Sequence, residues 1–218
     1  MIDNSVRSVC DALLFGDHNG KKYILLRWDF FANKYQLIGK GLEKVAINDE
    51  SDKVEAVLNS RLPSLKQYFD YVFVSKYEGY HFSAGSVDND PIWRKYLIDM
   101  AVLLPNNNSN TADIFKEIDR INMETKAKID ASVEITPSSA KELKYFVWCE
   151  VAELAEKPTV YRGNRVSGFG DLLGHLGEKS LRSLCNNLLT SLQLPDDYPT
   201  DDSMEECKRA FERKYVKG

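Results

Sequence analysis

A chain of 218 residues with a formal net charge of −4 has room for one sizeable core and an appendage, but hardly for two ordinary domains. Hydrophobic residues make up 43% of it and charged residues 28%, which is typical of a folded globular protein and excludes a largely disordered one. The negative charge does not favour a nucleic-acid partner or an anionic lipid surface.

The apolar runs are far shorter than the ~20 residues that a membrane-spanning helix needs, and the first residues lack the features of a secretory signal. We therefore expect a cytoplasmic protein without a membrane partner. The cysteines are widely spaced and form no C-x-x-C pair, which predicts reduced thiols rather than a zinc site or a disulfide scaffold. They are Cys10, Cys149, Cys185 and Cys207.

The first predicted elements are strands over residues 10–15 and 23–28, which are apolar. Asn19-Gly20 lies between them and supplies the positive-φ residues of a tight turn, so we predict an antiparallel hairpin. A further short strand is predicted over residues 35–38. It ends at Gly39-Lys40-Gly41, where two glycines indicate a bend or a close approach of the backbone.

An amphipathic helix is predicted over residues 52–62, with Ser51 as its N-cap and Pro63 as the residue that ends it. Its buried face is expected to contain Val54, Val57, Leu58 and Leu62. Three polar residues share another face, namely Asp52, Glu55 and Asn59. We interpret that face as the solvated one, the alternative being a weakened cation site.

The middle of the chain predicts aromatic-rich strands over residues 68–75 and 80–83, followed by a central, buried strand over residues 93–104. After a polar loop, a helix capped by Thr111 is predicted to run to residue 128. Its apolar face consists of Ile114, Phe115, Ile118 and Ile121.

The last part of the chain predicts a strand over residues 145–151 and a helical stretch over residues 171–194, broken near Gly174 or Gly177. A linker over residues 195–199 leads to a final helix that starts at Ser203. The apolar stripe of this helix is Met204, Cys207, Phe211 and Tyr215, which must pack either on its own domain or on a partner.

Residues 23–28 and 35–43, followed by a helix, resemble the opening of a Nudix domain, in which a "vLLvrR" strand precedes "W-x-L-P-G-G-x-x-E". Residues 146–154 resemble the "fxWvxxdEL" segment near the end of such domains. The resemblance to the Nudix hydrolase superfamily implies an α/β (α+β) fold, a mixed β-sheet sandwiched by helices, with an additional C-terminal helical segment. It implies a domain over residues 1–194 with an insertion at about 105–135, then a linker and amphipathic helix over 195–218.

The catalytic box of that family is G-x5-E-x7-R-E-U-x-E-E-x-G-U, and its helical glutamates hold magnesium beside a pyrophosphate. Glu50 matches its first glutamate best, but it follows Gly41 by three residues more than the motif allows. The R-E-U-x-E-E positions are then filled by Leu58, Asn59, Ser60, Arg61, Leu62 and Pro63. The box is therefore degenerate, and we predict no metal site or cofactor. Only a divergent hydrolase would need magnesium, with Glu43, Glu50 and Glu55 as candidate catalytic residues.

The resemblance places Arg27, Trp28 and Tyr35 on the substrate side of the sheet, where aromatic rings could stack on a base and cations could meet phosphate. The alternative for the rings is core packing. We add the Gly39-Lys40-Gly41 segment as a backbone approach, and Arg162 in a glycine-containing turn as an anion clamp or an ordinary exposed loop residue.

Three hypotheses follow for the function. The first is a Nudix-like module that binds or senses a nucleotide or nucleotide derivative and has a regulatory role. The second is a divergent magnesium-dependent hydrolase of a nucleoside diphosphate derivative. The third is a non-catalytic adaptor whose C-terminal helix docks a protein partner or a second copy in a homo-oligomer.

Overall fold

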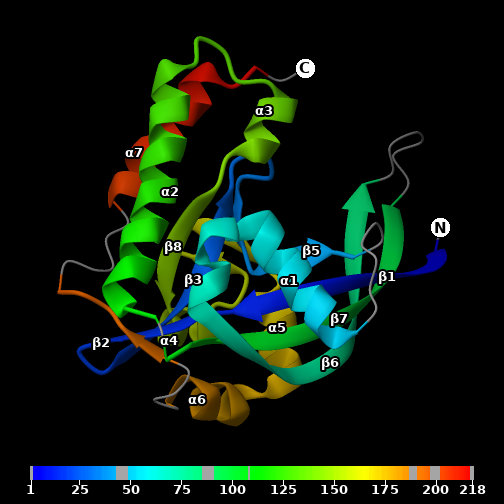
Figure 1. Cartoon of the computed structure of the whole chain (residues 1–218). Helices are drawn as coiled ribbons and strands as arrows, with labels where there is room; N and C mark the ends of the chain where they lie inside the picture. Colours follow the sequence, from blue (N-terminus) through cyan, green and yellow to red (C-terminus); the bar gives the residue numbers. More distant parts are fainter. Residues whose placement is uncertain are drawn as a thin grey trace.

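The computed structural model describes residues 2–42, 49–84, 91–107, 109–186, 191–196 and 202–216. Strands and helices are mixed along the chain, and helices cover both sides of the β-structure (Figure 1). This arrangement confirms the predicted α+β class. No helix in the described ranges has both the length and the apolar composition needed to cross a membrane.

The strands are β1 (Ile2–Leu13), β2 (Phe15–His18), β3 (Lys21–Asp29), β4 (Lys34–Gln36), β5 (Ile38–Gly41), β6 (Phe69–Ala84), β7 (Pro91–Pro105), β8 (Tyr145–Glu150), β9 (Val160–Tyr161), β10 (Asn164–Ser167) and β11 (Ser191–Gln193). The helices are α1 (Glu50–Arg61), the 3-10 helix η1 (Pro63–Tyr68), α2 (Thr111–Ala131), α3 (Pro137–Glu142), α4 (Val151–Glu156), α5 (Phe169–Leu176), α6 (Glu178–Asn186) and α7 (Asp202–Lys214).

The strands form two sheets that are linked by the continuous run of β1 into β2. One has the order β5-β1-β7-β6, in which β1 is parallel to β7 and antiparallel to β5. The other has the order β11-β2-β3-β4-β10-β9, and β8 also pairs with β3. The apolar strand β7 lies between β1 and β6, which confirms its predicted central position.

The Asn19-Gly20 hairpin is confirmed. Strands β2 and β3 are antiparallel, and Phe15 pairs with Ile24. The two turn residues have φ angles of 51° and 79°, the left-handed conformation that a two-residue hairpin loop requires.

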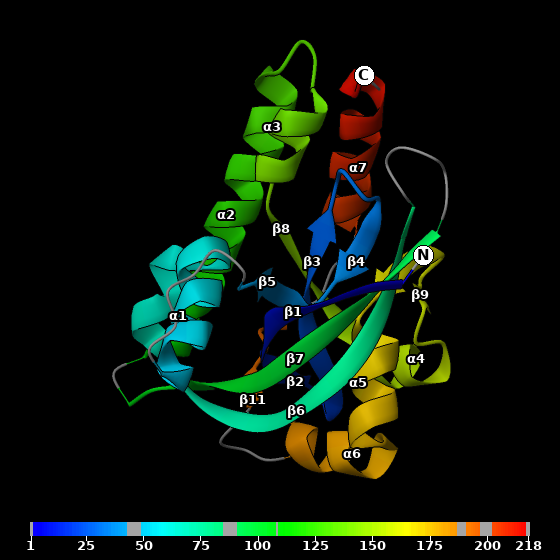
Figure 2. The ribbon, with the colours of Figure 1, turned by 90° about the vertical axis from the view of Figure 1, so that its right-hand side faces the viewer.

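Both faces of the sheets are buried, because alternate residues of a strand point to opposite sides. On one side, Leu13 and Phe15 join a hydrophobic cluster that includes residues of α5, α6 and α7. On the other, Ala12 and Leu14 join a cluster that includes residues of α1 and α2. The helices are therefore distributed over two layers with the sheets between them, as Figure 2 shows from the side.

Helix α1 has the predicted phase, because Val54, Val57, Leu58 and Leu62 are all 2% exposed or less. Its N-cap is Asp49 and not Ser51. The Asp49 side chain accepts a hydrogen bond from the backbone N–H of Asp52, and the Asp52 side chain reciprocates, so the capping box starts two residues earlier than predicted. Helix α2 likewise begins with Asn110, and not Thr111, as its cap.

Two further predictions need correction. The segments over 68–75 and 80–83 belong to one long strand, β6, which pairs with β7 along its length. The helical stretch after residue 171 does break at Gly177, whose φ is 75°, but residues 191–193 form strand β11 beside β2. Parallel pairing with a distant strand overrides the local helical pattern there.

The final helix α7 packs on its own domain, next to α2 (Figure 2). Three residues of the predicted stripe are buried in the same cluster as Trp28 and Phe30, namely Met204, Cys207 and Phe211. The hydroxyl groups of Tyr145 and Ser203 are 2.8 Å apart, which ties the start of the helix to β8.

Candidate ligand-binding site

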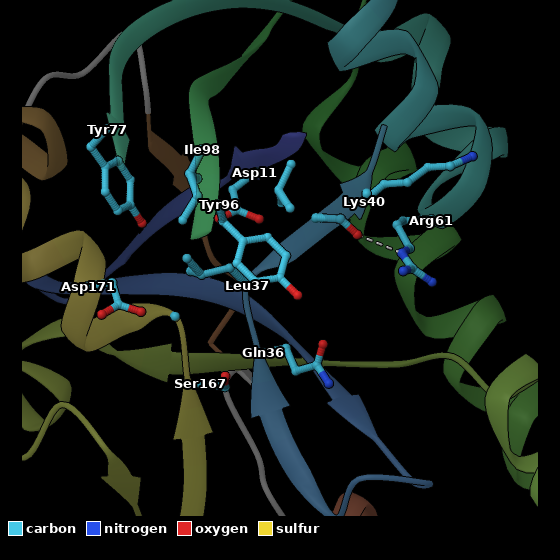
Figure 3. Close-up of a pocket in the computed structure, with 14 residues that line it drawn as sticks. Asp11, Gln36, Leu37, Lys40, Arg61, Tyr77, Tyr96, Ile98, Ser167 and Asp171 are labelled. Atoms are coloured by element: carbon cyan, nitrogen blue, oxygen red, sulfur yellow. Dashed lines mark hydrogen bonds between the residues drawn. The ribbon is translucent and has the colours of Figure 1, made fainter. Parts of the chain in front are cut away.

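A cavity of about 250 Å³ opens beside the Gly39-Lys40-Gly41 segment of β5, and we call it the first cavity (Figure 3). Strands β1, β6 and β7 supply one wall, and the start of α5 supplies another. The end of α1 reaches it through Arg61. Figure 3 shows its polar groups at two ends, with Asp171 and Tyr77 at one and Arg61 and Lys40 at the other.

Asp11, which interrupts an apolar strand, lies between the two ends of the cavity, beside Gly39 (Figure 3). Asp11 and Gly39 are paired residues of β1 and β5. Burial, and then the negative charge of Asp171, raise the pKa of Asp11 to about 7. Near neutral pH this carboxyl group therefore exists in both protonation states and can donate or accept a hydrogen bond.

Tyr77 lies across the cavity from β5 and adds a second buried polar group. Within the described residues its hydroxyl group has no hydrogen-bond partner. Burial and the charges of Asp11 and Asp171 raise its pKa above the usual range, so the hydroxyl stays protonated. Its ring stacks on His175 at 4.5 Å, which fixes its orientation. A buried hydroxyl without a partner costs free energy that a ligand acceptor could recover.

The cationic end is anchored by Arg61. Its Nε donates a hydrogen bond of 2.9 Å to the carbonyl oxygen of Gly39, which joins the last turn of α1 to β5. Burial and the nearby positive charge of Arg27 lower the pKa of Arg61 to about 10. Two neighbouring guanidinium groups repel each other, so an anion placed beside Arg61 would be stabilised.

Arg27 does not line the first cavity, but it contacts Gln36, which does. It is buried, and its Nη2 donates to Asp29 at 2.9 Å and to Gln36 at 3.2 Å. The Gln36 amide donates in turn to Asp29 at 2.6 Å. Gln36 lines the cavity whereas Arg27 does not, so Arg27 acts on the site through its charge and through Gln36.

The structure brings together only part of the ligand site expected from the sequence. Gly39, Lys40 and Gly41 all line the first cavity. Trp28 and Tyr35 are each 1% exposed and pack edge to face at 4.9 Å within the core, so their ring faces cannot stack on a ligand. This is the core-packing alternative for both rings.

Arg162 lies away from the residues that line the first cavity. Its guanidinium group is about 5.1 Å from the ring centroid of Tyr161, and its Nε is 3.5 Å from a carboxylate oxygen of Glu153. Its φ of 46° places it in a tight turn with Gly163. These contacts match the exposed-loop alternative more closely than an anion clamp at the cavity.

The candidate catalytic glutamates do not meet at the first cavity either. Glu43 lies outside the described residues. Glu50 is exposed in the first turn of α1, and Glu55 forms an ion pair of 2.6 Å with Lys66. Among the residues that the structure describes, no group of three His, Cys, Asp or Glu side chains is arranged to hold a metal ion.

Four of the polar residues on which the site depends were not singled out from the sequence as binding residues, namely Asp11, Arg61, Tyr77 and Asp171. Asp11 carried a usable signal, because a carboxylate inside an apolar strand is costly unless it has a role. Asp171 follows a Gly-Phe-Gly segment at a helix start, which is a weaker signal. Nothing local distinguishes Tyr77 from the other aromatic residues of β6.

Comparison with known proteins finds a partial structural similarity to solved structures. A scan against protein-family models found no match, and a search of curated proteins found none. Among solved structures, NrtR of Shewanella oneidensis is similar over 97% of this chain and 80% of its own, with 12% identity and a TM-score of 0.42. The Ap4A hydrolase of C. elegans is similar over 55% of this chain and 91% of its own, with 13% identity and a TM-score of 0.30.

A third similar structure is the NUDIX domain of Shewanella oneidensis NrtR complexed with ADP ribose. It matches 52% of this chain and 79% of its own, with 13% identity and a TM-score of 0.28. Identities and TM-scores this low describe a partial likeness of architecture and no more.

Proposed function

We propose that this protein binds a nucleotide or nucleotide derivative in the first cavity and acts as a sensing or regulatory module. The observation that carries the proposal is that one cavity has Lys40 and Arg61 at one end, Asp171 and the free phenol of Tyr77 at the other, and the carboxyl group of Asp11 between them. A nucleotide has the matching polarity, with anionic phosphate at one end and hydroxyl or amino donors at the other.

Each end has a chemical role in this proposal. Lys40 and Arg61 attract the phosphate, because charge-assisted hydrogen bonds to phosphate oxygens are among the stronger polar contacts. Asp11 and Asp171 accept hydrogen bonds from sugar hydroxyls or a base amine, and Tyr77 donates one. The apolar side chains of Leu37 and Ile98 lie between the two ends.

The volume limits what the cavity can enclose. At about 250 Å³ it is at the small end of ligand sites, which are typically about 300–1,000 Å³. It therefore suits one nucleoside or sugar-phosphate unit, and the remainder of a larger derivative would lie outside it.

Binding is favoured over hydrolysis by the positions of the acids. A Nudix-type reaction requires carboxylates that hold magnesium against the pyrophosphate. Glu50 and Glu55 do not line the first cavity, and Glu55 already has Lys66 as its partner. We therefore propose binding without turnover.

The test is a titration with nucleoside mono- and diphosphates and nucleoside diphosphate sugars, ADP-ribose among them, followed by the unfolding midpoint and by calorimetry. A ligand that binds only the folded state raises that midpoint. Asp171→Asn should weaken binding at least about tenfold, the loss expected when a charged hydrogen-bond acceptor is removed. Asp70→Asn, an exposed change of the same kind on β6, should not.

Turnover is measured in the same samples. Magnesium-dependent release of phosphate or a mononucleotide, abolished by Glu50→Gln or Glu55→Gln, would contradict the proposal and favour the hydrolase. Absence of any response to the whole panel would contradict ligand binding itself.

A further inference from the structure

A second cavity, of about 430 Å³, lies between the end of α1, η1, α2 and the start of β8. Arg61 lines both this second cavity and the first one. The other cations around it are Arg120, Lys128 and Lys144, and the acids are Glu124 and Glu142.

The charges around the second cavity are not balanced. Arg120 is neutralised by Glu117, which accepts a hydrogen bond of 2.8 Å from its Nε, and by Glu124. In contrast, the ammonium groups of Lys128 and Lys144 form no hydrogen bond or ion pair with any residue that the structure describes. Glu142 is the one acid of the lining that forms no ion pair with a residue that the structure describes.

The cations are close enough to affect one another. Lys144 is half-buried, and its pKa is lowered by burial and then by the positive charges of Arg61, Lys128 and Arg27. No acidic group offsets these causes. A bound anion would supply the missing counter-charge and would itself be held by several cations at once.

The backbone of Lys144 is fixed to α2, the helix that carries Lys128. The Thr125 hydroxyl on α2 donates to the carbonyl oxygen of Lys144 and accepts from its N–H at 3.3 Å. One turn earlier, the Asn122 side chain makes the same pair of bonds with the backbone of Phe146, at 2.9 and 2.8 Å. Helix α2 and the start of β8 are therefore joined, and a site built on both is largely formed before a ligand arrives.

We propose that the second cavity is a phosphate-binding site, with Lys128 and Lys144 as its ligands and Arg61 in its wall. Phosphate is the anion that fits, because it presents oxygens in several directions to cations that come from three separate elements. The site needs no nucleotide in the first cavity, so it goes beyond the proposed function.

The test uses inorganic phosphate as the probe, titrated into the full chain at low ionic strength and followed by amide chemical shifts and by calorimetry. Lys128→Gln and Lys144→Gln should each weaken phosphate binding at least about tenfold, as expected for loss of a charged hydrogen-bond donor. Lys116→Gln on α2 and Lys141→Gln on α3 are matched controls. Both remove the same charge from exposed lysines that do not line the second cavity.

If phosphate is attracted only by the overall charge of the protein, all four substitutions should weaken its binding equally, and that result would overturn the proposal. The proposal would also be overturned if phosphate changed the amide chemical shifts only of residues around the first cavity. A second readout needs no ligand: because Lys144 is repelled by its neighbours, Lys144→Gln should unfold at the same temperature as the wild type or higher. A large decrease relative to Lys141→Gln would show that the lysine has a structural partner and would also overturn it.

The proposed function and the phosphate site can be tested separately. Asp171→Asn should leave phosphate binding in the second cavity unchanged, while it weakens nucleotide binding in the first. A protein that binds phosphate through Lys128 and Lys144 but no nucleotide would refute only the proposed function.

Discussion

The carboxyl group of Asp11 occupies the space that a side chain at position 39 would need. A Cβ atom built on Gly39 would lie 1.9 Å from Oδ1 of Asp11, far inside van der Waals contact. The two residues are paired across β1 and β5, so neither can move without disturbing the sheet. Gly39 is thus required by the buried carboxyl and not by a turn.

Gly39→Ala should destabilise the fold by about 1–3 kcal/mol, the usual cost of adding a methyl group to a filled interior. The measurement is the free energy of unfolding in denaturant. Gly174→Ala is the matched control, because nothing lies within 4 Å of a Cβ at that helical position. It should be neutral or stabilise by about 0.5–1 kcal/mol. Equal effects of the two substitutions would contradict the close contact with Asp11.

The same carboxyl predicts a pH dependence of stability. Its pKa is about 7 in the folded protein, against 3.8 for an unburied carboxyl. Between these values the folded chain retains a proton that the unfolded chain has lost, so the free energy of unfolding falls as pH rises. The loss develops from about pH 4 to about pH 7, amounts to at most roughly 4 kcal/mol, and is constant above that window.

Asp11→Asn isolates this contribution, because an amide resembles the protonated carboxyl and does not ionise in that range. The stability of the wild type relative to the variant should decrease between pH 4.5 and pH 7.5. A carboxyl resonance of Asp11 that titrates near pH 4, or a difference that does not change with pH, would contradict the burial of its charge.

Leu58→Ala tests the packing of α1 beneath the site. The side chain is 2% exposed and lies in the cluster that α1 shares with α2 and the sheet. Its truncation should cost about 2–5 kcal/mol, the range for a buried leucine. Asn59→Ala, exposed on the next position, should change stability by less than about 0.5 kcal/mol. A small effect of Leu58→Ala would mean that the helix is not held by this face.

The elements that could be predicted from the sequence are those fixed by local chemistry. Asn19-Gly20 determines its own turn, and the spacing of Val54, Val57 and Leu58 determines which face of α1 is buried. The elements that could not be predicted depend on distant partners. Strand β11 exists because residues 191–193 pair with β2, and no pattern within those residues indicates that partner.

The candidate site divides in the same way. The glycine segment at 39–41 signalled a close approach of the backbone, and it does line the first cavity. Trp28 and Tyr35 were expected there because aromatic rings beside cations can stack on a base, but strand alternation turns both into the core. Asp11, Tyr77 and Asp171 come from β1, β6 and α5, so only the fold brings them together.

Helix α7 is expected to complete the fold and not to serve as a detachable interface. Phe211 is 5% exposed and its ring lies 5.0 Å from that of Phe30, while the Lys208 ammonium is 5.2 Å from the Trp28 ring centroid. Helix α7 therefore covers the aromatic end of the β3–β4 hairpin. Without it, a large apolar surface would be exposed to water.

Phe211→Ala should accordingly cost about 3–5 kcal/mol in the free energy of unfolding, as for other buried phenylalanines. Met123→Ala is the control, because Met123 is 72% exposed on the neighbouring helix α2 and should change stability little. Truncation after Pro199 should give an unstable or insoluble product. An intact, equally stable monomer after truncation, particularly one that replaces an oligomer of the full chain, would instead identify α7 as the docking surface for a second copy. Its buried stripe would then be the interface and not a part of the core.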